Sequence, residues 1–155
     1  MAGQDEIMSR IAEAIERGQS GDREAARQMF AGIWKELSAD GDPLHRCTLA
    51  HYMADLQDDP HEELAWDLRA LEAADQVPDE ERAREYHDHE ALSVRGFYPA
   101  LHLNLAEDYR KVGDLARARE HVARARASAE ALDEDGYGQM IRAGIERLSR
   151  QLSPE

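Results

Sequence analysis

One stretch near the C-terminal end constrains the fold of this chain more than any other feature. It reads Leu105-Ala106-x-x-Tyr109-x-x-x-Gly113-Asp114-x-x-x-Ala118-x-x-x-Val122-x-x-Ala125. Large apolar residues and alanines recur at helical spacing on both sides of a Gly-Asp turn, and the alanines leave room for a close helix crossing. The stretch therefore predicts two helices that pack against each other as a hairpin.

Two weaker copies of this pattern precede it. In each first helix, a small alanine follows an aliphatic residue at the crossing; the buried sets are Met8/Ile11/Ala12/Ile15, Arg46/Leu49/Ala50/Met53 and His102/Leu105/Ala106/Tyr109. The second helices supply Ala26/Phe30/Ile33, Leu64/Leu68/Leu71 and Ala118/Val122/Ala125. The spacing between the crossing alanines is irregular, because Ala50 follows Ala12 by 38 residues and Ala106 follows Ala50 by 56.

The C-terminal copy resembles the tetratricopeptide repeat, a helical hairpin of 34 residues that stacks into arrays. Residues 57–68 and 95–99 also resemble a recurring variety of bacterial tetratricopeptide-repeat proteins that is functionally uncharacterised as a group. The resemblance covers nearly the whole chain, and it implies an all-α, right-handed superhelix in a single domain, residues 1–155. We expect about three hairpins, an inserted helix and a C-terminal capping helix. The alternative is an ordinary antiparallel helical bundle.

The expected helices follow from apolar periodicity and from turn residues. Asp22 is placed to cap the second helix, Pro43 suits the first position of the third, and Arg95–Pro99 predicts a break and restart of the chain. Residues 79–93 give only a thin apolar stripe and are the least regular segment. The expected helical ranges are about 5–17, 23–37, 43–56, 60–74, 79–93, 99–112, 114–131 and 137–152.

The charge of the chain is negative and uneven. The net charge is −14, and residues 55–90 hold 14 acidic residues against three arginines, a net of −11. An acidic surface repels phosphate backbones and anionic lipid, which argues against nucleic-acid and membrane partners. Two interpretations of the acidic region remain: it keeps the protein soluble, or it binds a basic partner.

Cys47 is the only cysteine, so no intrachain disulfide can form and a reducing compartment is the simpler assignment. The N-terminal residues lack the pattern of a signal peptide, and no apolar run reaches the roughly 20 residues of a membrane span. We therefore expect a cytoplasmic protein. The 17 arginines against two lysines are typical of a GC-rich bacterial source.

In tetratricopeptide arrays the concave groove is lined by the outward side of each first helix. Carried onto this sequence, the resemblance gives a groove of mixed charge that is basic only at its C-terminal end. The candidate partner-binding residues are Ser9, Glu13, Arg17, Cys47, His51, Asp55, Leu103, Glu107, Arg110 and Lys111. The positions of the family's carboxylate clamp read Ser9, Glu13, Thr48, Ala100 and Asn104, and none of them matches, so a chaperone-tail ligand is disfavoured.

The seven histidines raise the question of a metal site. His87 and His89 point about 200° apart on a helix and cannot chelate one ion together. Glu85 with His89 provides only two ligands, fewer than a zinc site needs. We expect no metal and no cofactor, and the sequence has no phosphate-binding loop or nucleophile motif. The alternative is a small metal-dependent hydrolase with His51, His87, His89 and His102 in one pocket.

These observations favour a non-catalytic adaptor that binds a protein or peptide, with a basic partner one option. A self-associating structural module, and hence a homo-oligomer, is a further alternative.

Overall fold

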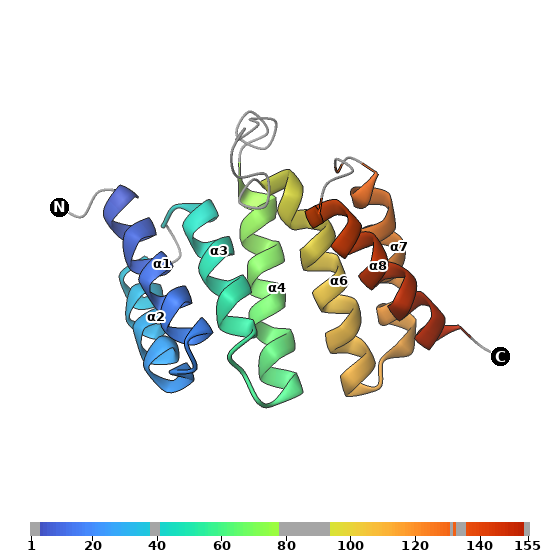
Figure 1. Cartoon of the computed structure of the whole chain (residues 1–155), viewed down its shortest axis with the longest axis horizontal. Coiled ribbons are helices and arrows are strands. Elements are labelled where there is room, and N and C mark those ends of the chain that lie inside the picture. Colours follow the sequence, from blue (N-terminus) through green and yellow to red (C-terminus); the bar gives the residue numbers. More distant parts are fainter. Residues whose placement is uncertain (1–3, 38–40, 78–93, 131, 133–135, 154–155) are drawn as a thin grey trace. The chain divides into compact units, whose positions relative to one another are not determined.

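The computed structural model describes residues 4–37, 41–77, 94–130, 132 and 136–153, and within these ranges all regular structure is helical, with seven helices and no strand. Figure 1 shows them as α1 to α8. The prediction of an all-α fold is thus confirmed. The helices are α1 (Gln4–Gln19), α2 (Arg23–Leu37), α3 (Pro43–Ala54), α4 (Pro60–Gln76), α6 (Val94–Val112), α7 (Leu115–Ala129) and α8 (Gly136–Leu152).

Short-range signals set several of these helix ends. Asp22 and Asp114 accept hydrogen bonds from the amide three residues on, and Asp42 accepts one from the amide of Leu44 at 2.9 Å. Pro43 occupies the first helical position after Asp42, as predicted. Gly113 has a φ of 90°, a conformation that favours glycine, and it ends α6 just before α7 begins.

Helix α6 corrects one prediction. It begins at Val94 and passes through Pro99, where we expected a break. Proline removes one backbone hydrogen bond but has a φ suited to a helix, and Pro99 lies early in α6 with its ring fully buried. The predicted insert helix, residues 79–93, lies outside the described residues.

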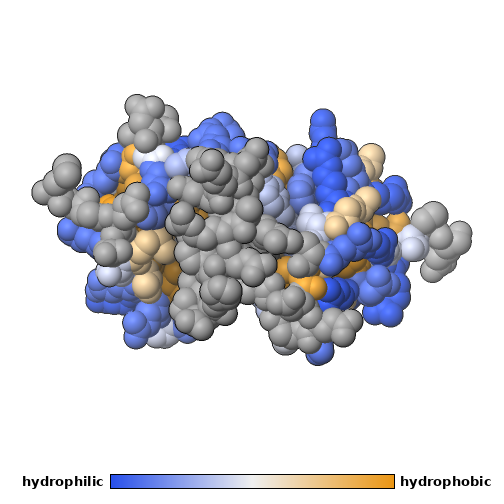
Figure 2. Space-filling model, turned by 90° about the horizontal axis from the view of Figure 1, so that it is seen from above, coloured by the Kyte–Doolittle hydropathy of each residue, from blue (hydrophilic) through white to orange (hydrophobic). Residues whose placement is uncertain are grey.

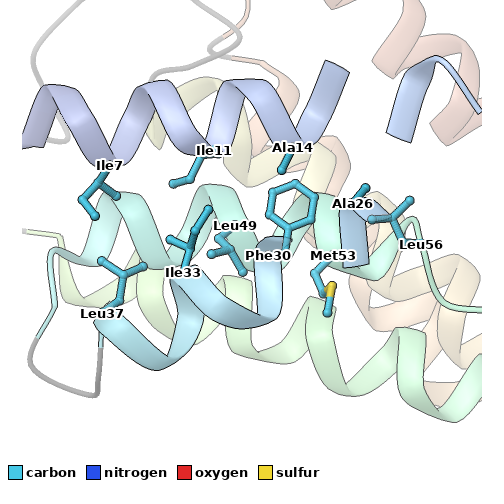
Figure 3. Packing of buried hydrophobic residues seen from close by; sticks show 10 residues of the cluster. All are labelled: Ile7, Ile11, Ala14, Ala26, Phe30, Ile33, Leu37, Leu49, Met53 and Leu56. Atoms are coloured by element: carbon cyan, nitrogen blue, oxygen red, sulfur yellow. The ribbon is translucent and has the colours of Figure 1, made fainter. Parts of the chain in front are cut away.

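Two compact units emerge from the packing of residues 1–155, which were predicted to form one domain. The units are residues 1–73 and 74–155. In the first unit α1 packs along α2, and α3 contacts both of them. Figure 3 shows the core between these helices: Ile7, Ile11, Ala14, Ala26, Phe30, Ile33, Leu37, Leu49, Met53 and Leu56.

The buried side of α1 differs from the prediction. Ile7, Ile11 and Ala14 are buried, whereas Ala12 is exposed. The predicted and the observed apolar stripes share Ile11, and α1 carries apolar residues on more than one side. Periodicity alone was therefore compatible with either stripe as the buried one. The choice rested on Ala12 as the crossing alanine, but Ala14 is the one that the neighbouring helices cover.

The second unit repeats the arrangement of the first. Helices α6 and α7 pack together, and α8 contacts both. The predicted hairpin positions Leu105, Ala106, Ala118, Val122 and Ala125 are all buried, and Tyr109 is half-buried. The core is completed from α8 by Ile141, Ile145, Leu148 and Leu152.

Helix α4 does not follow the predicted stripe of leucines. Leu68 is 39% exposed, while Asp67 and Ala70 are buried. Leu64 and Leu71 are half-buried. The buried side of α4 is formed mainly by small alanines, and the larger leucines lie at its edges. The spacing of the leucines correctly predicted a helix, but it did not identify the buried side of that helix.

Arginine side chains close the C-terminal ends of three helices. Each donates to main-chain carbonyl groups that have no partner within their own helix. The bonds are Arg23 to Asp55 O (3.4 Å) and Arg27 to Leu56 O (3.2 Å) after α3, Arg142 to Ala129 O (3.2 Å) and Leu132 O (2.8 Å) after α7, and Arg119 to Leu152 O (3.1 Å) at the end of α8.

Charged and polar side chains cover much of the described surface, as the blue areas of Figure 2 show, with apolar patches between them. Among the described residues, no helix is long and apolar enough to cross a membrane.

Candidate functional site

A cleft of about 260 Å³ lies between α6 and α8 in the second unit. Its walls combine two leucines with amide and charged side chains, so it offers both apolar surface and hydrogen-bonding groups. The lining residues are Leu103, Asn104 and Glu107 from α6 and Gly144, Arg147, Leu148 and Gln151 from α8.

The side chain of Leu103 on α6 packs against the backbone of Gly144 on α8. A Cβ atom at this position would lie 2.8 Å from Leu103 Cδ2 and 3.8 Å from an Nη atom of Arg147. The missing side chain of Gly144 therefore makes room for Leu103, and Arg147 lines the cleft beside it. Gly144 is itself buried, which puts the close approach at the base of the cleft.

Cations dominate the electrostatics of the cleft. Arg110 Nε donates to Glu107 Oε2 at 2.9 Å, and this bond is the main reason that the pKa of Glu107 lies below its usual range. The positive charges of Arg110, Lys111 and Arg147 lower that pKa further, whereas partial burial opposes the shift. Three cations thus act on the carboxylate of Glu107.

Arg147 differs from Arg110, which is hydrogen-bonded to Glu107. Among the described residues Arg147 makes no hydrogen bond or ion pair, and its side chain is exposed. An exposed guanidinium next to apolar surface is well suited to pair with a planar anionic group such as a carboxylate.

The structure brings part of the predicted groove together. Leu103 and Glu107 line the cleft, and Arg110 is bonded to Glu107 beside it. Lys111 is exposed one turn after Glu107. These four predictions all fall on one helix, α6.

The residues predicted from the first helical hairpin are exposed on α1. Ser9 and Glu13 are open to solvent, and Arg17 forms an ion pair of 3.4 Å with Asp22 at the start of the next helix. Arg17 therefore has a structural partner, and its role as a ligand contact stays a prediction.

Helix α3 holds the remaining predictions, and one of them needs correction. Cys47 is fully buried, so its side chain offers no surface to a ligand. The predicted register placed Cys47 outward, but this face of α3 is covered. His51 is half-buried against the Tyr52 ring, and burial lowers the pKa of His51 to about 4. Asp55 is exposed and lines a separate depression of about 180 Å³ in the first unit.

The α8 residues of the cleft were missed by sequence reasoning. We treated α8 as a cap and considered only its apolar stripe. Gly144 was a usable signal, because a glycine inside a helix usually marks a close backbone or side-chain approach. Arg147 and Gln151 follow Gly144 by about one and two turns of α8, and both are exposed.

Two of the histidines that the structure describes, His102 and His121, are packing residues, whereas His61 is exposed. His102 Nδ1 lies 3.0 Å from His121 Nδ1 between α6 and α7, and both side chains are buried. Tyr98 and Tyr109 extend the stack of rings on either side. In the described part of the chain, no group of three or more His, Cys, Asp or Glu residues could hold a metal ion. The predicted cluster at His87 and His89 lies outside the described residues.

No protein-family model, curated protein or solved structure matches this chain.

Proposed function

We propose that this protein is a non-catalytic binding module of the tetratricopeptide-repeat type that holds a peptide segment of a partner protein in the cleft between α6 and α8. The cleft is the observation that carries the proposal. It is open to solvent, it is walled by two helices rather than by loops, and it combines apolar and hydrogen-bonding side chains.

The packing order supports the repeat-type assignment. In a stacked array, the first helix of a hairpin contacts its own second helix and the first helix of the next hairpin. The contacts of α1 with α2 and α3 follow this order, and so do those of α6 with α7 and α8. In this arrangement α6 and α8 are consecutive first helices, the type that lines the concave groove of such arrays.

The size of the cleft favours side chains as ligands. Pockets for whole cofactors or metabolites measure roughly 300–1,000 Å³. At about 260 Å³, this cleft is suited to one or two side chains of a peptide that continues along the surface. The two helical walls are held by buried leucines and isoleucines, so the site is preformed.

Two further parts of the proposal rest on the sequence. A single cysteine, which is buried, is compatible with a reducing compartment, and we place the protein in the cytoplasm. The enzyme alternative required His51 and His102 to join His87 and His89, and its decisive residues lie outside the described ranges.

A peptide selection tests the proposal. The full-length protein is presented with a library of random 12-residue peptides, and enriched peptides are measured by fluorescence anisotropy. Gln151→Trp places a bulky ring at the mouth of the cleft, whereas Gln139→Trp makes the same change at another exposed glutamine of α8. We expect Gln151→Trp to weaken binding at least about tenfold and Gln139→Trp to leave it within about twofold, since a blocked pocket loses its central contacts.

The control measurements are circular dichroism and the melting temperature, which should agree among the three proteins. Enriched peptides that bind both variants equally well would remove the cleft as the site. A selection that enriches no peptide would count against the binding function itself.

A further inference from the structure

We infer that the contact between His102 and His121 makes the second unit a proton-sensitive conformational device, in which α6 separates from α7 when both imidazole rings take up protons. The separation is a local opening that leaves the first unit folded, and it is independent of the peptide-binding function proposed above. Helix α6 carries three residues of the cleft, so the opening removes one wall of that cleft.

The two rings face each other through the same ring nitrogen. His102 Nδ1 on α6 lies 3.0 Å from His121 Nδ1 on α7, so one nitrogen donates its proton and the other accepts it. A single added proton can go to the second nitrogen of the donating ring. When both rings are protonated, both facing nitrogens carry hydrogen, and the hydrogen bond is replaced by two like charges in contact.

Burial keeps water from stabilising these charges. His102 and His121 are buried, and tyrosine rings lie next to them, Tyr98 beside His102 and Tyr109 beside His121. An imidazolium that leaves water without gaining a counter-ion loses much of its hydration free energy. The two charged rings can therefore be hydrated only when α6 and α7 move apart, which couples proton uptake to the opening.

The charged groups around the pair come from α4 and α7. Arg124 of α7 opposes protonation of both rings, whereas Glu120 of α7 favours that of His121 and Asp75 of α4 favours that of His102. In the described part of the chain, the charges that act on the two rings include none from α8. Burial is the largest contribution for both rings and lowers the pKa of each, that of His102 to about 4.

The packing allows the second unit to open without the first. Around the pair, the α6–α7 crossing is filled largely by small side chains, and Ala106, Ala118 and Ala125 are fully buried there. Stabilisation by burial scales with apolar area, so such a crossing separates at a lower cost than one packed through large side chains. The buried core of the first unit shares no residue with that of the second.

Proton linkage sets the size of the effect. A hydrated histidine has a pKa of about 6.5, whereas that of His102 in the closed unit is about 4. The open state therefore holds more protons between these values, and opening becomes more favourable as the pH falls from 6.5 toward 4. From pH 6 to pH 5, His102 alone raises the opening constant about sevenfold. His121, whose pKa is lowered in the same direction, raises the factor further.

Amide hydrogen exchange followed by mass spectrometry at pH 6 and pH 5 tests the inference, with rates corrected for the intrinsic pH dependence of exchange. All proteins carry His51→Gln, because His51 of the first unit also has a lowered pKa. The test variant adds His102→Gln and His121→Gln, which keep two neutral hydrogen-bonding side chains. The matched control adds His61→Gln, which removes an exposed histidine of α4.

In the His51→Gln protein, the opening constant of α6 and α7 amides should rise at least about sevenfold from pH 6 to pH 5, whereas that of α1 and α2 amides should change less than about twofold. The test variant should reduce the change in α6 and α7 to less than about twofold. The His61→Gln control should keep the full change. Circular dichroism at pH 7 checks that each variant is folded.

Three results would overturn the inference. An opening constant of α6 and α7 that does not change with pH would show that the pair takes up no protons on opening. An equal pH dependence in the test variant would assign the opening to other groups. An equal rise in both units would mean that the whole chain opens together. If the test variant does not fold, the single variants His102→Gln and His121→Gln replace it, and each should show a smaller pH dependence than the His51→Gln protein.

Discussion

The buried pair of histidines between α6 and α7 predicts that acid destabilises the second unit. His102 and His121 are 8% and 7% exposed, and their Nδ1 atoms are 3.0 Å apart. One nitrogen donates a proton to the other, which requires at least one neutral ring. Burial is the largest cause of the lowered pKa of His102, about 4, and the positive charges of His121 and Arg124 lower it further, although Asp75 opposes them. The pKa of His121 is also lowered, first by burial and then by Arg124, against the effect of Glu120.

The sign and size of the effect follow from these pKa values. In the unfolded chain, histidine binds a proton near pH 6.5, whereas His102 in the folded protein resists it until about pH 4. Between these values the unfolded state holds more protons, so stability is present above pH 6.5 and is lost as the pH falls toward 4. A shift from 6.5 to about 4 corresponds to about 3 kcal/mol for His102. His121 adds to the loss in the same direction.

The assay measures the free energy of unfolding in urea by circular dichroism at pH 7, 6, 5 and 4. The double variant His102→Gln/His121→Gln keeps two neutral hydrogen-bonding side chains but removes both titrations. Its loss of stability between pH 7 and pH 4 should be smaller than that of the wild type by at least about 3 kcal/mol, because both titrations are removed. His51 titrates in both proteins, and its contribution therefore cancels.

A direct titration completes this test. The imidazole resonances of His102, assigned by comparison with the single variant His102→Gln, should show a pKa near 4. A pKa above 6, or equal acid sensitivity of wild type and double variant, would refute the reasoning that burial keeps this pair neutral.

Four further predictions concern packing and metal content. Ala118→Leu should overpack the α6–α7 crossing and cost roughly 1–3 kcal/mol in urea unfolding, because Ala118 is fully buried; a neutral effect would contradict the close crossing. Phe30→Ala should cost roughly 3–5 kcal/mol, read from the fluorescence of Trp34 and Trp66 in the same unit; a loss below 1 kcal/mol would be inconsistent with the core of Figure 3. Gly144→Ala should change stability by no more than about 1 kcal/mol, since the gain in helix propensity offsets the displacement of Leu103; a larger loss would mean that Leu103 cannot move. Chelation with EDTA should leave the melting temperature unchanged, whereas a metal at 100 times its dissociation constant would add about 2.7 kcal/mol. A drop in the melting temperature on chelation would support the alternative that the protein is a metal-dependent hydrolase.

Sequence periodicity located the helices well where turn residues agreed with it. Asp42-Pro43 and Gly113-Asp114 each mark the start of a helix. The two aspartates cap the helices, Pro43 has a fixed φ, and Gly113 provides a left-handed turn, so each signal acts within a few residues. Periodicity was less reliable for the buried side. In α1 and α4 several apolar stripes coexist, and only the neighbouring helices decide which stripe they cover.

The candidate site was half predictable for a similar reason. Leu103 and Glu107 followed from the register of the strongest hairpin, whereas Arg147 and Gln151 enter the site only because α8 packs beside α6. That contact joins residues about 40 positions apart in the chain, and no local pattern encodes it. The prediction for Cys47 was wrong for the opposite reason. The helical register placed Cys47 on the outward side of its helix, but register does not show which neighbouring elements cover that side.

The arginines at the ends of α3, α7 and α8 have a consequence for how the protein opens. At the C-terminal end of each of these helices, carbonyl groups accept hydrogen bonds from an arginine of a different helix. These carbonyls depend on the neighbouring helix for their hydrogen-bond donors. When α8 detaches, Arg142 leaves the carbonyls after α7, and when α7 detaches, Arg119 leaves the end of α8. The two helices should therefore fray together, and their terminal amides should exchange with solvent at one common rate. Both bonds of Arg142 come from one Nη atom, whose two N–H groups have fixed directions in the guanidinium plane, so a single rigid donor group holds the two carbonyls.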